Sequence, residues 1–131
     1  MAKERINTDN APKAIASYSQ AIKSNGFIFV SGQGPFDPAT GEVVGATIQE
    51  QTAQCLRNIE AILLAGGSSL ENAVSATFIL ADENDFVGMN EEWGKWFGDL
   101  PPARQGSKLI FPEITPRFKD MKISIWLIAE A

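Results

Sequence analysis

Arg104 is the residue whose type and surroundings best suit chemistry. It follows two prolines in the stretch "LPPARQG", residues 100–106, so the backbone just ahead of it is restricted. A guanidinium that projects from a rigid segment can bind a carboxylate or a phosphate through two parallel hydrogen bonds. The alternative suggested by composition is an ordinary surface salt bridge with one of the 16 acidic residues. The residues alone leave both interpretations open.

Several other kinds of chemistry are excluded. The chain contains no histidine and a single cysteine, Cys55, so Ser31 and Cys55 lack the base that usually activates such nucleophiles. One cysteine forms neither an intrachain disulfide nor a thiolate metal cluster. No phosphate-binding loop is present, and "GQGPFD" leads into a loop and not into the helix that a dinucleotide fingerprint requires. Nucleotide-binding motifs are therefore set aside.

The balance of charge and apolar residues indicates one acidic globular domain, residues 1–131. The chain has 11 basic and 16 acidic residues, a formal charge of −5 and 44% hydrophobic residues. An acidic chain repels phosphate backbones, so we expect no nucleic-acid partner. The N-terminus lacks the apolar stretch of a signal peptide, and no run approaches the roughly 18 residues that cross a bilayer. We expect a cytoplasmic protein with no membrane partner.

The first half of the chain predicts a hairpin, a loop and a helix. Asn25-Gly26 is typical of a type I′ turn between a strand ending near Lys23 and the β-rich "FIFV". Glycines and prolines between 32 and 46 predict a surface loop. A helix follows from Thr47 to a C-terminal cap at Gly66-Gly67. Its apolar or small stripe comprises Ile48, Thr52, Cys55, Leu56, Ile59, Ile62 and Leu63.

The second half predicts a strand, a helix and two more strands. "AVSATFIL", residues 73–80, has strand composition, and "ADEND" supplies caps for a helix that ends at Gly98. "ARQGSKLIF" and "MKISIWLIA" have strand composition on either side of a loop, "PEITPRFKD". The stripe of the second helix comprises Phe86, Met89, Trp93 and Phe97, which are more often core residues than cofactor ligands.

The resulting order is β-β-α-β-α-β-β, an α+β domain with two helices on one face of a sheet. "FIFV" and "ISIWLIA" are apolar on both faces, although two helices can cover one face only. We therefore expect the other face to pack against further copies of the chain in a homo-oligomer. The alternative is a sheet that curls over itself.

Several separated motifs, in order and in register from about Asn7 to Ala103, resemble the Rid (YjgF) family of enamine/imine deaminases. These motifs are "APKAIASYSQAI", "GFIFVSGQGPFDPATGEVVG", "EQTAQCLRNIEAIL", "DFVGMNEEW" and "PPAR". The resemblance implies a chorismate-mutase-like fold, a homotrimer with three clefts between subunits, and hydrolysis of a small carboxylate-bearing enamine or imine to a 2-keto acid and ammonia. It implies no cofactor.

The same resemblance assigns site residues by matching positions. Arg104 would bind the substrate carboxylate, and Tyr18, Ser31, Gly32 and Asn90 would line the cleft. Tyr18 and Ser31 have alternative interpretations, as a buried hydroxyl with a partner and as a cap at a strand end. An anchored substrate presents its imine carbon to water in a fixed orientation.

Departures from the family pattern surround Arg104. Ser124 stands where the last strand of the family usually carries a glutamate that positions the attacking water. A serine hydroxyl can hold water but is a weak acid and base, and loss of a general acid–base group typically costs about 10²- to 10⁴-fold in rate. Gln105 and Gly106 replace the usual serine and cysteine; Gln105 adds a donor and an acceptor, and Gly106 opens space.

The segment 111–120 is several residues longer than the family norm. Arg117 or Lys119 could bring a second cation to the cleft, and Glu113 or Asp120 a substitute carboxylate. A solvated loop with scattered charges is the alternative.

Two functions from different classes remain in view. The first is a Rid-like hydrolase of the 2-iminobutanoate/2-iminopropanoate deaminase type, with Arg104 and Ser124 at its catalytic centre and an altered substrate or reduced rate. The second is a non-catalytic protein that keeps the arginine cleft for a small anion such as a 2-keto acid. An endoribonuclease is disfavoured by the acidic charge and the lack of histidine.

Overall fold

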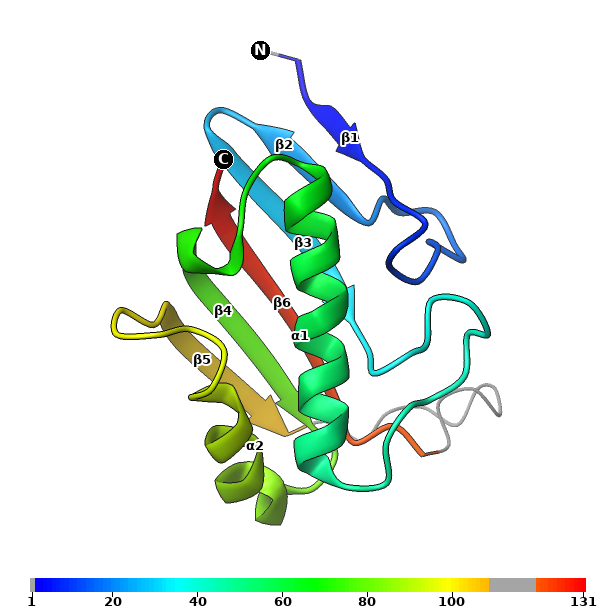
Figure 1. Ribbon diagram of the computed structural model, residues 1–131, viewed down its shortest axis with the longest axis vertical. Coiled ribbons are helices and arrows are strands. Elements are labelled where there is room, and N and C mark those ends of the chain that lie inside the picture. Colours follow the sequence, from blue (N-terminus) through cyan, green and yellow to red (C-terminus); the bar gives the residue numbers. More distant parts are fainter. Residues whose placement is uncertain (1, 109–119) are drawn as a thin grey trace.

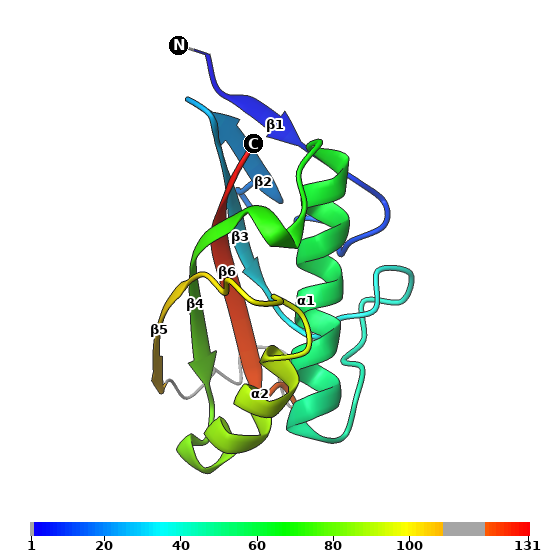
Figure 2. The same ribbon diagram turned by 60° about the vertical axis from the view of Figure 1, so that its left-hand side comes forward.

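The structure, a computed structural model, describes residues 2–108 and 120–131 and forms one six-stranded sheet with two α-helices. The strand order is β1-β2-β3-β6-β4-β5, and only the pair β4–β5 is parallel. Both helices lie on the same face of the sheet (Figures 1 and 2). The elements are β1 (Glu4–Ile6), β2 (Ala21–Ser24), β3 (Phe27–Gln33), α1 (Ile48–Ala65), β4 (Ala73–Leu80), α2 (Phe86–Trp93), β5 (Ala103–Lys108) and β6 (Ile123–Glu130).

The N-terminal hairpin forms as predicted. Asn25 and Gly26 have φ values of 52° and 83°, the left-handed region that a type I′ turn requires at both central positions. The turn pairs Ser24 with Phe27 at the start of a regular antiparallel register. The short strand β1, which pairs with β2, is an additional element that the sequence did not indicate because it spans three residues.

Helix α1 follows the predicted pattern along its whole length. The Thr47 hydroxyl accepts a hydrogen bond from the Glu50 amide, and the Glu50 carboxylate accepts one from the Thr47 amide, which completes a capping box. Gly66 caps the C-terminus, and all seven residues of the predicted stripe are buried. This stripe packs on β3 and β6, where Ile28, Ile125 and Leu127 complete the core.

Helix α2 is shorter than predicted. It ends at Trp93, because Gly94 is a poor helix residue, and turns replace the helix as far as Gly98. Phe97 is nevertheless buried, and Met89 and Trp93 belong to the core as predicted. Phe86 departs from the predicted stripe, since its side chain is 40% exposed at the edge of the sheet.

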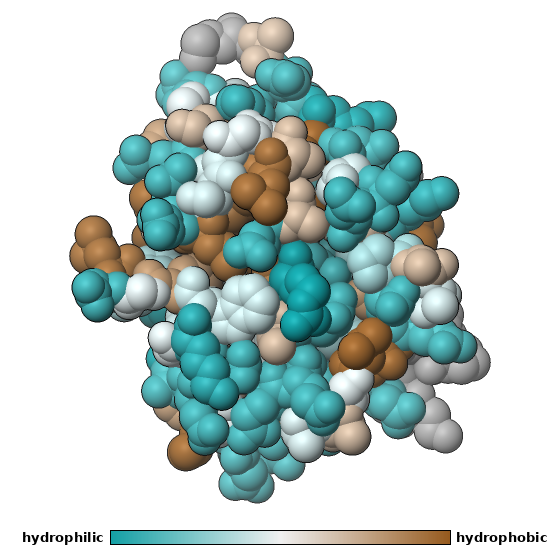
Figure 3. Space-filling model, viewed as in Figure 1, coloured by the Kyte–Doolittle hydropathy of each residue, from teal (hydrophilic) through white to brown (hydrophobic). Residues whose placement is uncertain are grey.

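The second face of the sheet carries exposed aromatic residues. Phe27, Phe29 and Trp126 are exposed on β3 and β6, whereas the helix-covered face of the molecule is mostly hydrophilic at its surface (Figure 3). The prediction that two helices cover one face only is confirmed, and the alternative in which the sheet curls over itself is wrong for the described residues. Whether further copies of the chain cover this face stays a prediction.

Part of the C-terminal half lies outside the described residues. This includes residues 109–111 of the predicted strand and nearly all of the loop at 111–120, with Glu113, Arg117 and Lys119. Among the residues that the structure describes, no helix is long and apolar enough to cross a membrane.

Candidate functional site

Arg104 lies on edge strand β5, with its side chain on the face that the helices cover. Parallel pairing sets it beside Ala76, two residues before Phe78 on β4, so the side chains of Arg104 and Phe78 lie on the same face of the sheet. The guanidinium carbon is 5.1 Å from the ring centre of Trp93, 5.4 Å from that of Phe78 and 5.6 Å from that of Phe86. Three aromatic faces at these distances attract the cation and restrict its movement.

Asn90 gives this guanidinium its polar contact. Nη1 of Arg104 donates a hydrogen bond of 2.8 Å to Oδ1 of Asn90. No Asp or Glu among residues 2–108 and 120–131 forms an ion pair with Arg104, so the salt bridge suggested by composition is not found there. A half-buried cation with a neutral acceptor keeps donors for an incoming anion, and a carboxylate matches their fork geometry.

Gly106 has a structural role beside Arg104. A Cβ atom at this position would lie 2.2 Å from Cζ of Phe78, because the Phe78 ring is folded over the glycine. The space expected above Gly106 is therefore filled by a ring that also contacts Arg104. A cysteine, which the family pattern has here, would displace that ring.

A second group of the expected residues gathers around β3 and the segment before β2. Tyr18, Gly32 and Ser124 line one small cavity of about 120 Å³, and Tyr18, Ser31 and Gly32 border a shallower depression with Trp126. A Cβ at Gly32 would be 3.4 Å from the Ser124 hydroxyl, so a side chain at position 32 would fill the space beside that hydroxyl. This group lies where the register between β3 and β6 shifts, which is typical of a β-bulge.

Local hydrogen bonds hold this second group. The Ser31 hydroxyl donates to the Ser19 carbonyl at 2.6 Å, so it has a structural partner, but Ser31 lies inside β3 and is not the strand-end cap of the alternative interpretation. The Tyr18 hydroxyl accepts a 3.4 Å bond from the Ile15 amide, although its side chain is exposed. Buried Gln20 fixes the segment before β2 by bonding to Thr8, and to the carbonyl groups of Ala11 and Pro12.

The two groups lie on opposite faces of the sheet within one chain. Ser124 alternates with the buried residues Ile123 and Ile125 and therefore faces away from the helices, whereas Arg104 contacts α2. Gln105 also points to the face that the helices do not cover, where its amide donates a hydrogen bond to the Thr77 hydroxyl. A single chain brings Arg104 together with Asn90, and Ser124 together with Tyr18 and Gly32, but does not bring the two groups together.

Sequence reasoning missed the aromatic rings around Arg104 and the contribution of Lys13, which lines the cavity with Ser124. One signal was available: Phe86, Asn90 and Trp93 are spaced by four and three residues, so they share a helix face. The sequence did not indicate that this helix face packs on Arg104, because that contact depends on the pairing of β4 with β5.

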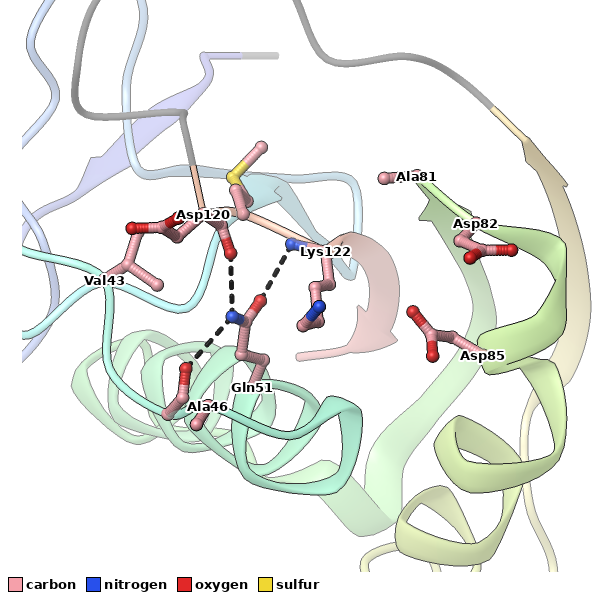
Figure 4. Close-up of a pocket in the computed structure, with 10 residues that line it drawn as sticks. Val43, Ala46, Gln51, Ala81, Asp82, Asp85, Asp120 and Lys122 are labelled. Carbon is pink, nitrogen blue, oxygen red and sulfur yellow. Dashed lines mark hydrogen bonds between the residues drawn. The ribbon is translucent and has the colours of Figure 1, made fainter.

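A further cavity, about 820 Å³, lies at the N-terminal end of α1. Gln51 crosses its wall and donates to the carbonyl groups of Gly45 and Asp120, while accepting from the Lys122 amide at 2.8 Å (Figure 4). Asp82 and Asp85 also border it, but no group of three His, Cys, Asp or Glu side chains in the described part of the chain is placed to hold a metal ion. Through these hydrogen bonds, Gln51 links the N-terminal end of α1 to the segment that leads into β6.

Cys55 is a core residue, as predicted. Its side chain is fully buried, and burial raises the pKa of the thiol. A protonated buried thiol is a poor nucleophile, so Cys55 takes no part in the candidate site.

Comparisons with known proteins agree on one family. The model of the family described as Endoribonuclease L-PSP matches residues 8–130. A RutC family protein of Pyrococcus horikoshii is 48% identical over 127 residues, which cover 97% of each chain. A 2-iminobutanoate/2-iminopropanoate deaminase of Capra hircus is 43% identical over 99 residues, 76% of this chain and 72% of that protein. A crystal structure of Escherichia coli TdcF with bound serine has a TM-score of 0.87 and 32% identity, and covers 98% of each chain.

Proposed function

The chain belongs to the Endoribonuclease L-PSP family, the family of the RutC and Rid proteins, and on this premise we propose that it hydrolyses small carboxylate-bearing imines and enamines. The observation that carries the proposal is the guanidinium of Arg104, held by Asn90 and three rings with no carboxylate partner among the described residues. The names of the goat deaminase and of serine-bound TdcF support a ligand with a carboxylate next to a carbon–nitrogen bond.

The reaction that fits this anchor is hydrolysis of a 2-imino acid. Arg104 binds the carboxylate, so that the neighbouring imine carbon is held in one orientation. The oxygen of water forms a bond to that carbon, the carbon–nitrogen bond breaks, and nitrogen leaves as ammonia while a 2-keto acid remains. An enamine reaches the same products after its carbon is protonated.

We propose that the cleft is completed by a neighbouring subunit of a homotrimer. Arg104 and Asn90 lie at the β5 edge near α2, whereas Tyr18, Gly32 and Ser124 lie beyond the opposite face of the sheet. Exposed Phe29 and Trp126 supply apolar surface for such an assembly. Two half-sites in each chain then give three complete clefts in a closed ring of three.

Ser124 limits the rate that is expected for the proposed hydrolysis. The described residues that line its cavity include Lys13 and Tyr18 but no Asp or Glu. Ser124 can hold the attacking water by a hydrogen bond but is a poor base, so the proposed rate is lower than that of a site with a carboxylate. The same observation favours a second candidate function, binding of a 2-keto acid without catalysis. A nuclease is not proposed, because the chain is acidic and has no histidine.

Semicarbazone trapping tests these two functions. An amino-acid oxidase generates short-lived imines, and free imine is trapped by semicarbazide unless the protein hydrolyses it first. The wild type is expected to lower trapping, Ser124→Glu to lower it further, and Arg104→Met to have no effect. If neither the wild type nor Ser124→Glu lowers trapping of any imine, the hydrolase proposal is wrong. Activity in Ser124→Glu alone favours the binding function.

A further inference from the structure

An apolar pocket lies beside Arg104 on the helix-covered face of the sheet. It has a volume of about 270 Å³, and its apolar wall is formed by Phe78, Leu80 and Phe86. Gly106 borders it without a side chain. Glu83 and Lys108, whose charged groups are 3.5 Å apart, close one side of its rim.

The pocket and the anchor share two rings. Phe78 and Phe86 line the pocket and also lie 5.4 and 5.6 Å from the guanidinium carbon of Arg104. Phe78 and Leu80 are almost fully buried, while Phe86 is 40% exposed, so they provide a fixed floor and one accessible wall. A ligand bound to Arg104 therefore has an apolar surface within the length of one side chain.

The order of residues along β5 explains why the pocket exists. Arg104, Gly106 and Lys108 point to the same face, in register with Ala76, Phe78 and Leu80 of β4. Any side chain at 106 would fall on the Phe78 ring. Glycine at this position thus lets the Phe78 ring lie against β5. The space on the other side of that ring is then free for a ligand.

We propose that this pocket receives the side chain of the substrate, and that the preferred substrates are 2-imino acids with branched aliphatic or aromatic side chains. This inference rests on the proposed function, because it takes Arg104 as the carboxylate anchor. The methyl group of an alanine-derived imine is too short to cover the exposed surface of Phe86, whereas an isobutyl or benzyl group removes part of that surface from water while packing on Phe78 and Leu80. A polar side chain would lose hydrogen bonds to water without replacement.

The size of the expected preference follows from apolar recognition. One methylene group in an apolar pocket changes kcat/KM by about 10- to 200-fold. An isobutyl group adds three carbon atoms to a methyl group, and part of the pocket is open to solvent. We therefore expect leucine- and phenylalanine-derived imines to be hydrolysed with a kcat/KM at least about tenfold above that of the alanine-derived imine.

The test compares imines from alanine, leucine and phenylalanine, generated at matched rates and followed by semicarbazone trapping. A leucine-to-alanine ratio of kcat/KM of at least about ten supports the inference. Equal values, or a preference for alanine, overturn it and leave the hydrolase proposal intact. If no imine is hydrolysed, the hydrolase proposal fails, and the inference is decided by calorimetry. In that case 4-methyl-2-oxopentanoate must bind at least about tenfold more tightly than pyruvate; equal affinities overturn the inference.

Two substitutions of Phe86 isolate the pocket from the anchor. Phe86→Leu and Phe86→Asn both remove the ring that lies against Arg104, but only leucine keeps an apolar wall. The leucine-to-alanine ratio is expected to persist in Phe86→Leu and to fall toward one in Phe86→Asn. Lys108→Trp, which places a large ring at the rim, is expected to lower the ratio as well. Ratios are the readout because partial unfolding would lower both rates together, and a ratio unchanged in both Phe86→Asn and Lys108→Trp contradicts the pocket.

Discussion

Arg104 and Asn90 form a 2.8 Å hydrogen bond that joins an edge strand to a helix through a cation and a neutral amide. A carboxylate at position 90 would neutralise the guanidinium, whereas the amide oxygen orients it and leaves its charge uncompensated. Trp93 lies one helical turn further along α2 and packs against the same guanidinium. The helix therefore positions the cation without supplying a counter-charge. The guanidinium thus stays available to bind an anionic ligand.

Asn90→Asp tests this relationship directly. The new carboxylate would pair with Arg104 and compete with the carboxylate of a ligand. Hydrogen bonds to charged groups contribute about 1.5–3 kcal/mol, so we expect the affinity for a 2-keto acid to fall about 10- to 150-fold. Asn90→Ala, which removes the orienting bond but adds no charge, is expected to lose less. Calorimetric titration measures both, and equal affinity in wild type and Asn90→Asp would contradict the anchor role.

Phe78 and Gly106 are expected to be coupled in stability. Gly106→Ala places a Cβ atom in contact with the buried Phe78 ring, and overpacking of this kind typically costs about 1–3 kcal/mol. Phe78→Leu makes room for the new methyl group. The double variant should therefore lose less stability than the sum of the two single variants, by about 1 kcal/mol or more. Urea unfolding at one fixed protein concentration measures the difference; simple additivity would show that the ring and the glycine do not interact.

The elements that could be predicted from the sequence are those with a local cause. Asn25-Gly26 determines its hairpin by backbone preference alone, and Thr47 with Glu50 forms the cap that starts α1. The early end of α2 also has a local cause in Gly94, but the apolar spacing to Phe97 masked it. The strand β1 is too short for a pattern.

The candidate site could be predicted only in part, because its geometry depends on pairing between distant segments. Arg104 was identified from the prolines before it, and Asn90 from the resemblance. The rings of Phe78 and Phe86 were not, since their position beside Arg104 follows from the parallel register of β4 with β5. Sequence spacing likewise does not reveal that Ser124 faces the open side of the sheet.

The capping box of α1 predicts a pH dependence of stability. The pKa of the Glu50 carboxyl is lowered, first by the hydrogen bond from the Thr47 amide, then by the Thr47 hydroxyl and the Ala46 amide. A lowered pKa in the folded state means that the stabilisation is present above the ordinary glutamate pKa and is lost as the pH falls through the lowered value. The stability difference between wild type and Glu50→Gln should therefore be largest near neutral pH and should shrink in acid.

Chemical unfolding at several pH values measures that difference. Thr47→Ala removes the hydroxyl bond but keeps the backbone bond, so it should lose about 1 kcal/mol and reduce the pH-dependent part without abolishing it. A difference between wild type and Glu50→Gln that stays constant from neutral to acid pH would contradict the role of the carboxylate.

The face of the sheet opposite the helices is expected to form the contacts between subunits. Phe29 is 45% exposed at the centre of this face, in register with Ile128, and Leu64 is 62% exposed on the outer side of α1. We expect light scattering to report three chains for the wild type and one for Phe29→Glu, because a carboxylate without a partner is costly to bury between subunits. Leu64→Glu, on the helix-covered face, should keep three chains.

Phe29→Glu should also lose activity while keeping its circular dichroism spectrum, because Arg104 and Ser124 meet only across subunits in the proposed cleft. A wild type that is a monomer at micromolar concentration, or an active monomeric Phe29→Glu, would contradict the shared cleft.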